Sequence, residues 1–215
     1  MFGRSQLSPV IFICTLALQP NTTEALDFRE KNTGLEGLID VELAYGLGVR
    51  TEDADPKLVS IANGGKRFNS GNFDDGTLNY DEGDLTSNML RTTGEVTLRW
   101  GDFGAFFRGY AFYDYENEDN NRARTELTAE GKEQVGSDAQ LLDANFSARF
   151  TVRDVPLILR LGDQVVNWGE SRFFPASGVN VANPVDIPLF RQPTSTSRDL
   201  RKPVGMLWGT AHLTP

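Results

Sequence analysis

The sequence predicts an all-β protein: the N-terminal portion, of about six strands, of an antiparallel up-and-down transmembrane β-barrel with long extracellular loops. Three observations support this prediction. Long segments alternate between apolar and polar residues, tight turns alternate with long loops between these segments, and the first 25 residues are organised like an export signal.

Residues 1–25 have the three parts of a signal peptide. Arg4 supplies a positive n-region, residues 10–18 form a short apolar run, and residues 23–25 fit a small-x-small cleavage site. Cleavage there would start the mature protein near Leu26 and remove Cys14, the single cysteine. A cysteine-free mature chain suits an oxidising compartment. We expect residues 1–25 to be a signal peptide and residues 26–215 to form the barrel portion.

The first predicted strand covers residues 39–50, where Ile39, Val41 and Leu43 share one face and Asp40 and Glu42 share the other. This segment is about twice the usual strand length in a soluble protein. A tilted strand that crosses a membrane needs roughly 9–11 residues. The length therefore favours a membrane barrel.

Four further segments alternate in the same way, and a fifth does so weakly. They are residues 88–100, 103–115, 141–152, 157–166 and the weaker 203–214, whose faces the pattern does not assign. In the 141–152 segment, the pattern places Leu142, Ala144 and Phe146 on the apolar face. Thr128 and Gly136 would begin and end a short helix in the preceding loop.

The connections between these segments are unequal. Residues 101–102 and 153–156 are tight turns, whereas loops 51–87, 116–140 and 167–202 are longer than a compact domain usually has. Outer-membrane barrels combine short periplasmic turns with long extracellular loops. In such a barrel the apolar faces meet lipid and the polar faces meet an aqueous lumen. Aromatic side chains near strand ends, at 100, 103, 113 and 115, would form the girdle. The alternative is a secreted soluble β-sandwich, whose strands alternate in the same way.

Six strands are too few to close a membrane barrel, for which eight is the lower bound. The sequence ends on Leu213-Thr-Pro215 and not on the aromatic residue with which such barrels usually end. We therefore expect the N-terminal part of a longer open reading frame.

The composition argues against several other functions. A formal net charge of −9 leaves no basic stripe for nucleic acid. The single histidine, His212, has no serine nucleophile motif near it, so we expect neither an enzyme nor a cofactor. The acidic loop 72–84 offers oxygen atoms for Ca²⁺ or Mg²⁺, but its spacing misses the EF-hand pattern. We interpret it as a solvated loop and predict no metal site.

Charged residues on the polar faces are the candidates for a lumen function. They could select solutes or simply form a polar wall whose charges satisfy one another. The candidates are Glu42, Arg91, Glu95, Arg99, Arg108, Asp114, Asp143, Arg149 and Arg160. A second group lies in the long, proline-rich and net basic loop 168–202, which could fold inward as a plug or constriction or remain an ordinary extracellular loop. Its candidates are Trp168, Glu170, Arg172 and Asp186.

Five motifs together resemble one family. They are IANGG (61–65), DDGTLNYDEGDLTSN (74–88), WGDFGAFFRGYAFYDYEN (100–117), LRLGDQVVNWGES (159–171) and GVNVANPVDI (178–187). The chain resembles the Gram-negative outer-membrane β-barrel family known as domain of unknown function 1302 over nearly all of residues 36–215. Members are longer than this chain. Asp163 departs from the family pattern, in which a basic or neutral polar residue is more usual, so a lumen role does not carry over to this position.

The resemblance implies a porin-like barrel in the Gram-negative outer membrane that passes small, hydrophobic molecules. It also implies contact with outer-membrane lipid and lipopolysaccharide, insertion by the barrel-assembly machinery, and an exporter or lipoprotein partner. These are analogies of fold and gene neighbourhood, not of site chemistry. A structural or adhesive barrel without transport is the alternative function.

Overall fold

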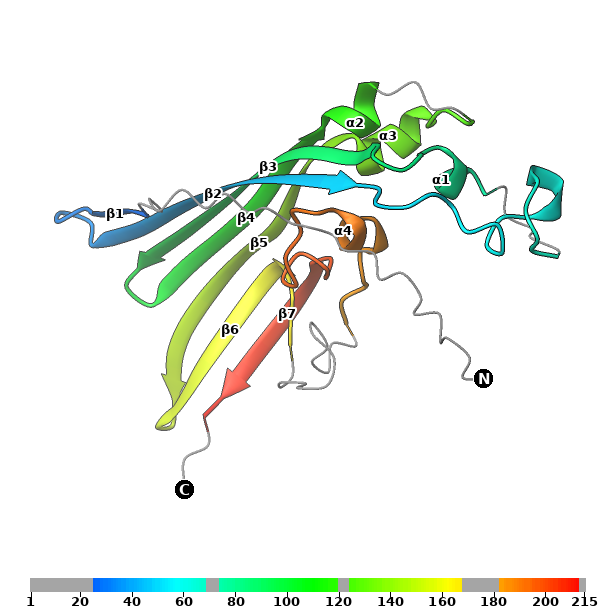
Figure 1. Cartoon of the computed structure of the whole chain (residues 1–215). Coiled ribbons are helices and arrows are strands. Elements are labelled where there is room, and N and C mark those ends of the chain that lie inside the picture. Colours follow the sequence, from blue (N-terminus) through cyan, green and yellow to red (C-terminus); the bar gives the residue numbers. More distant parts are fainter. Residues whose placement is uncertain (1–24, 69–73, 120–123, 168–181, 213–215) are drawn as a thin grey trace, which may run out of the picture.

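A computed structural model describes residues 25–68, 74–119, 124–167 and 182–212 (Figure 1). Seven strands form one sheet in which each strand pairs antiparallel with the next strand in sequence. The strands are β1 (Leu26–Arg29), β2 (Leu35–Val49), β3 (Leu85–Trp100), β4 (Phe103–Asp114), β5 (Ser137–Val152), β6 (Val155–Gln164) and β7 (Val204–Ala211). The predicted antiparallel up-and-down arrangement is confirmed.

The strand number differs from the prediction, because the sheet has seven strands and not six. The additional strand, β1, has four residues and pairs Leu26 with Ile39 and Arg29 with Glu36. Four residues are too few to show an alternating pattern in the sequence. The partner strand β2 also begins at Leu35, earlier than predicted, because residues 35–38 pair with residues 97–100 of β3.

Three short connections join neighbouring strands at one end of the sheet, which we call the turn end. They are residues 30–34, 101–102 and 153–154. The β3–β4 turn is Gly101-Asp102, with Gly101 at a φ of 58°. The β5–β6 turn is Arg153-Asp154, with φ angles of 48° and 67°. Two consecutive left-handed residues match the twist of a two-residue hairpin. The long connections 50–84, 115–136 and 165–203 lie at the opposite, loop end, so the predicted asymmetry is confirmed.

Side chains alternate between two faces, and paired residues on neighbouring strands share a face. The outer face carries Leu43, Phe107 and Leu161; the inner face carries Glu95 and Arg108. The sheet curves, and the segment that contains α4 (Ile187–Arg191) lies on the inner side of the curve (Figure 1).

One assignment of faces was wrong. Arg108 pairs with Asp143 but Gly109 pairs with Leu141, so Leu142 is the extra residue of a β-bulge. The bulge turns Leu142 to the inner face, where it is 6% exposed, while Leu141 is 68% exposed on the outer face. An inserted residue shifts the alternation by one position, and the sequence pattern alone did not reveal it.

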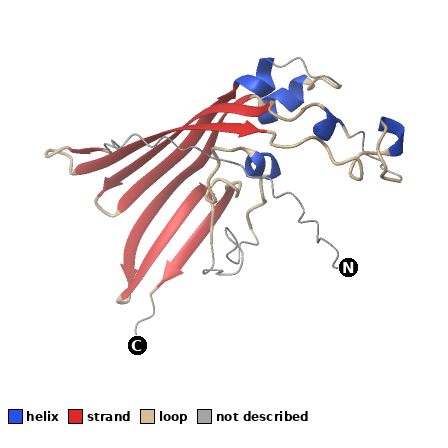
Figure 2. Ribbon diagram, in the orientation of Figure 1, coloured by secondary structure: helices blue, strands red, loops and turns tan. Residues whose placement is uncertain are grey.

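The helices lie at the loop end and on the inner side of the sheet (Figure 2). They are η1 (Ile61–Asn63), α1 (Asp75–Leu78), α2 (Tyr115–Asp119), α3 (Ala129–Val135) and α4. The predicted helix in loop 116–140 is α3, with Thr128 Oγ1 accepting a hydrogen bond from Gly131 N and Gly136 as the C-cap. Among described residues, the buried core joins α4 to the inner face: Met89, Tyr110, Phe112, Leu142 and Leu189.

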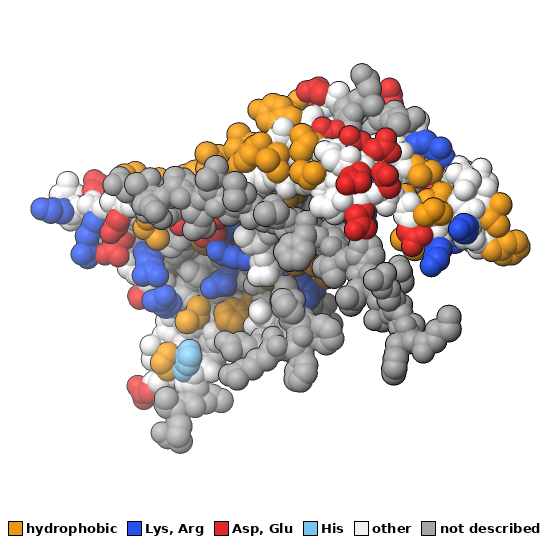
Figure 3. All heavy atoms as spheres, viewed as in Figure 1, with side chains coloured by type: hydrophobic (Ala, Val, Ile, Leu, Met, Phe, Trp, Pro, Cys, Tyr) orange, Lys and Arg blue, Asp and Glu red, His pale blue; other side chains and the backbone are white. Residues whose placement is uncertain are grey.

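The outer face presents large apolar side chains that no described element covers. Leu43 is 57% exposed, Phe146 and Leu161 are each 60% exposed, and Leu207 is 68% exposed. Figure 3 shows hydrophobic side chains along the outer edge of the curved sheet and Lys and Arg side chains on its inner side. The aromatic pairs predicted for a girdle lie at opposite ends, with Trp100 beside Phe103 at the turn end and the rings of Tyr113 and Tyr115 4.8 Å apart at the loop end.

The sheet is open. Its edges are β1 and β7, and no pairing joins them within the described ranges. None of the helices in this part of the chain combines the length and apolar character that a membrane-spanning helix requires.

Candidate functional site

Three predicted candidates meet across three neighbouring strands of the inner face. Glu95 on β3 pairs with Arg108 on β4, and Arg108 pairs with Asp143 on β5. Arg108 Nε lies 3.3 Å from Glu95 Oε1, and Arg108 Nη1 lies 3.6 Å from Asp143 Oδ2. Opposite charges at directly paired positions stabilise a sheet. The prediction that neighbouring inward charges form cross-strand ion pairs is confirmed for these residues.

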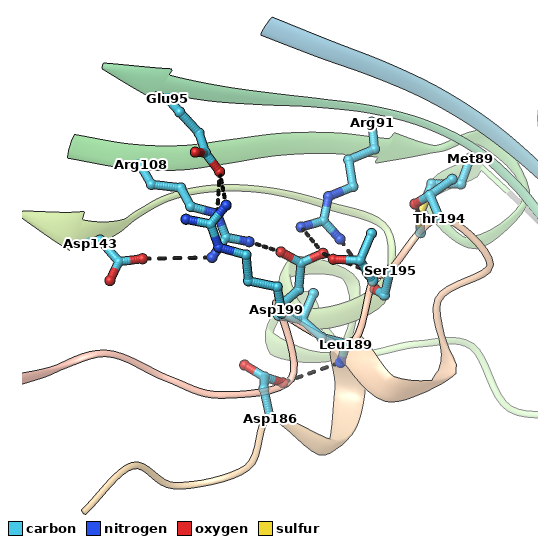
Figure 4. Close-up of polar contacts among 12 residues, drawn as sticks. Met89, Arg91, Glu95, Arg108, Asp143, Asp186, Leu189, Thr194, Ser195 and Asp199 are labelled. Atoms are coloured by element: carbon cyan, nitrogen blue, oxygen red, sulfur yellow. Dashed lines mark hydrogen bonds and ion pairs between the residues drawn. The ribbon is translucent and has the colours of Figure 1, made fainter. Parts of the chain in front are cut away.

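Arg108 has a third carboxylate partner, Asp199, which comes from the connection between β6 and β7 (Figure 4). Arg108 and Asp199 are each only 3% exposed. A buried guanidinium is tolerated only when carboxylates compensate its charge, because the interior solvates ions poorly. Glu95 additionally binds Arg198 Nη1 at 2.6 Å, so the connection contacts this network twice.

Arg91 on β3 contacts the same carboxylate from the other side. Its Nη2 atom lies 3.1 Å from Asp199 Oδ2, and its Nη1 donates to Ser195 Oγ at 3.2 Å. The guanidinium carbon lies 4.5 Å from the ring centroid of Tyr110, in cation–π geometry. Arg91 is 2% exposed. One carboxylate therefore lies between two buried arginines of different strands.

Asp199 was not among the predicted candidates. Its Oδ2 accepts hydrogen bonds from Thr196 N at 2.9 Å and Thr196 Oγ1 at 2.8 Å, which closes a local turn. A threonine three residues before an acidic residue is a turn and capping signal that the sequence does contain. That signal could have identified the turn. It carries no information about Arg91 and Arg108, which lie far away in sequence.

Asp186, a predicted constriction candidate, holds residues 182–203 in place through two contacts. Its Oδ1 accepts a hydrogen bond from Leu189 N at 3.2 Å and so caps α4, and its Oδ2 lies 3.0 Å from Lys202 Nζ. The cap places Leu189 in the core cluster beside Met89. Thr194 Oγ1 donates to Met89 Sδ at 3.1 Å, so the segment 182–203 contacts the inner face near the loop end. Trp168, Glu170 and Arg172 lie outside the described residues.

Asp114 was predicted to face a lumen; it lies at the loop end of the inner face, paired with Met89, and its side chain is fully buried. Its carboxylate accepts hydrogen bonds from the Ser87 hydroxyl, from Asn88 N at 3.0 Å and from Glu116 N at 3.0 Å. It also accepts from Asn117 Nδ2 at 2.9 Å. Asp114 thus fixes the start of α2 against β3.

The remaining candidates line two hollows on the inner face. Arg99, Arg149 and Arg160 line a cavity of about 650 Å³ at the turn end, together with Asn145 and Ser147. Glu42 lines a small hollow of about 70 Å³ with Arg91 and Thr196. Arg160 lies against the ring of Trp208 at 5.6 Å, which places β7's tryptophan on the inner face.

The chemistry of this site is that of a charged wall. Nowhere in the described ranges do three or more His, Cys, Asp or Glu side chains group as they would around a metal ion. Asp163, which departs from the family pattern, lies on the outer face, paired with Ala144 and Gly205. It therefore does not belong to the inner wall.

Comparison with known protein families gives one match. The family described as "Protein of unknown function (DUF1302)" matches residues 7–215. The chain belongs to this family. The resemblance inferred from the five motifs is thereby confirmed, and the DUF1302 match extends it toward the N-terminus. No significant match was found among curated proteins or among solved structures.

Proposed function

We propose that this DUF1302 member is a porin-like outer-membrane β-barrel through which small molecules pass. In this proposal the seven strands form part of the barrel wall, with the outer face in lipid and the inner face lining an aqueous lumen. The turn end lies on the periplasmic side and the loop end on the extracellular side, near lipopolysaccharide. The family context favours hydrophobic substrates.

The observation that carries the proposal is the contrast between the two faces. The outer face exposes a continuous band of large apolar residues, which soluble proteins rarely leave open to water. A soluble β-sandwich would cover this band with a second sheet. Residues 182–203 instead pack on the charged inner face.

The open edges β1 and β7 are the positions at which the wall would be completed. Among the described residues each edge strand pairs on one side alone, and backbone groups on the other side could not remain unsatisfied in lipid. The smallest membrane barrels have eight strands, so in the proposed barrel other strands would pair with these edges. Segment 182–203 would then narrow the lumen near the loop end, with Asp199 anchoring it to the wall.

Lipid exposure of neighbouring residues on one strand tests the proposal. Leu43→Cys and Glu42→Cys would each be made in a Cys14→Ala background, labelled with an environment-sensitive fluorophore and assembled into vesicles that contain brominated lipid. We expect strong quenching at position 43 and little at position 42, because the two side chains face opposite sides of β2. Leu161→Cys on β6 should behave like Leu43→Cys.

Equal quenching at positions 42 and 43 would contradict the proposed orientation. Conductance across planar bilayers is the second measurement, made with the unlabelled full chain. Lipid exposure with no conductance would favour the alternative, a structural or adhesive barrel. Protein that remains soluble after export, with water-accessible label at position 43, would contradict the membrane proposal itself.

A further inference from the structure

The cavity at the turn end has an unusual charge for this chain. It lies between the inner face and residues 197–201 of the β6–β7 connection. Six arginines and two aspartates contribute to its lining: Arg99, Arg108, Arg149, Arg160, Arg198, Arg201, Asp102 and Asp143. The whole chain carries a formal charge of −9, so arginines gather here against the overall balance. Figure 3 shows Lys and Arg side chains collected on the inner side toward the turn end.

The strand register explains the shape of this cavity. Arg99 pairs with Gly104, Gly104 with Ser147, and Ser147 with Arg160, so one row crosses β3, β4, β5 and β6. The two central residues are small, and a Cβ atom added at Gly104 would lie 2.7 Å from Ser147 Oγ. The centre of this row therefore holds only small residues, and an arginine stands at each end of it. Arg149 stands on the same face of β5, next toward the turn.

The arginines of the cavity differ in how far carboxylates neutralise them. Arg108 contacts Glu95, Asp143 and Asp199, and Arg198 contacts Glu95. In contrast, Arg99, Arg149 and Arg160 form no ion pair with any residue that the structure describes. Guanidinium groups that line a concave surface and lack a carboxylate partner focus positive potential into the cavity.

We propose that this cavity binds a small organic molecule through an oxyanion group, a carboxylate or a phosphate, held by Arg99, Arg149 and Arg160. The planar guanidinium fork matches the two oxygens of either group. Phe106, which also lines the cavity, lies beneath the Arg198 guanidinium at 5.8 Å and offers an apolar surface beside the charges. The cavity volume of about 650 Å³ is in the range of small-molecule sites.

This inference rests on the proposed function for its biological meaning, because a lumen would bring solutes to the cavity. Rings of arginine or lysine select anions in pores. The site would lie toward the periplasmic end of the lumen, below the constriction formed by segment 182–203. It would favour anionic or amphipathic anionic solutes over neutral ones.

Binding by the full-length protein in a zwitterionic detergent tests the site directly. Benzoate, inorganic phosphate and benzamide would be titrated by calorimetry; benzamide is the uncharged match of benzoate. We expect benzoate or phosphate to bind and benzamide not to bind. Tighter binding of benzoate would identify an aromatic carboxylate as the ligand class, and tighter binding of phosphate would identify a phosphate group.

Two variants and a matched control connect binding to the arginines. Arg99→Gln and Arg149→Gln should each weaken anion binding about tenfold, because each removes charge-assisted hydrogen bonds. Both side chains are exposed and lack ion pairs among described residues, so the fold should be retained, as circular dichroism would check. Arg191→Gln, at an exposed position of α4 outside the cavity, should leave binding unchanged.

The inference would be overturned by equal binding of benzoate and benzamide, by no binding of either anion, or by an equal loss in Arg191→Gln. Calorimetry in detergent needs no conductance, so the two proposals can fail separately. Arginine-dependent binding without conductance would contradict transport and leave the site standing. Conductance with no anion binding would contradict the site alone.

Discussion

A single carboxylate, that of Asp199, joins a loop to two strands of the sheet. Asp199→Asn would keep the shape of this side chain but remove the charge that compensates Arg91 and Arg108. Because both guanidiniums are buried, we expect the free energy of unfolding to fall by about 3 kcal/mol. Urea unfolding in detergent micelles measures this difference.

Asp154→Asn is the matched control for that experiment. Asp154 is an exposed turn residue with a φ of 67°, a conformation that asparagine adopts readily. Its urea midpoint should remain that of the unaltered protein. Trypsin should also cleave Asp199→Asn faster than the control after Arg198 or Arg201, because the anchoring of segment 182–203 is weakened. Identical cleavage rates would show that Asp199 does not hold the segment.

Asp74 provides a prediction about pH in the loop between β2 and β3. Hydrogen bonds from the Ser60 side chain, the Asn63 amide and the Ser60 backbone lower the pKa of Asp74 from 3.8 to about 2. A lowered pKa in the folded state means that the charged carboxylate stabilises the loop above the unfolded pKa. This contribution is lost as the pH falls from about 4 through about 2.

The amide proton of Ser60, followed by NMR between about pH 5 and about pH 1.5, should therefore titrate with a midpoint near 2. Asp74→Asn should remove this transition. A midpoint at the ordinary value of 3.8 would show that the hydrogen bonds to Asp74 are absent in solution.

At the scale of the element, the β-bulge in β5 makes two adjacent leucines unequal. Leu142→Ala would remove a side chain from the cluster of Met89, Tyr110 and Leu189, and we expect a loss of about 2–5 kcal/mol in the free energy of unfolding. Leu141→Ala is the matched control on the outer face, where the side chain is 68% exposed. Urea unfolding of both variants should show the larger loss for Leu142→Ala. A larger loss for Leu141→Ala would indicate that Leu141 faces inward and Leu142 outward, as the alternating sequence pattern predicted.

The elements also show what could be predicted from the sequence and what could not. A period of two was sufficient to find β2 to β6 and to assign most of their faces, because each strand repeats the pattern many times. It failed at Leu142, where one inserted residue shifts the pattern, and at β1, which is too short to have one. The partners of Asp199 could not be found, because residues that meet across more than 90 positions leave no local signal.

At the scale of the whole molecule, substitutions on the outer face should impair membrane assembly, whereas substitutions on the inner face should change ion selectivity. Leu43→Arg and Leu98→Arg would each place a charge on the outer face, which costs about 2–4 kcal/mol at the middle of a bilayer. We expect both variants to assemble poorly in the outer membrane. Arg99→Gln on the inner face should assemble normally and shift ion selectivity. Glu95→Gln should do the same, because Arg108 keeps the carboxylates of Asp143 and Asp199.

Heat-modifiable migration in outer-membrane fractions measures assembly, and reversal potentials in planar bilayers measure selectivity. Equal assembly defects in the two pairs of variants would contradict the assignment of faces. The predicted distribution of short turns and long loops agrees with the structure. It could be predicted because the number of residues between two alternating segments can be counted in the sequence. The curvature of the sheet and the packing of residues 182–203 depend on tertiary contacts and were not predictable in detail.

The order of the strands in space is also their order along the chain, and this has a consequence for the time course of folding. Each new strand meets only its predecessor, so the sheet can grow one hairpin at a time while the chain is still being delivered. The contact between Arg108 and Asp199 closes a span of 91 residues, and it cannot form until the chain beyond β6 has been delivered. We therefore expect the wall to form early and in sequence, and the segment across its inner face to dock last.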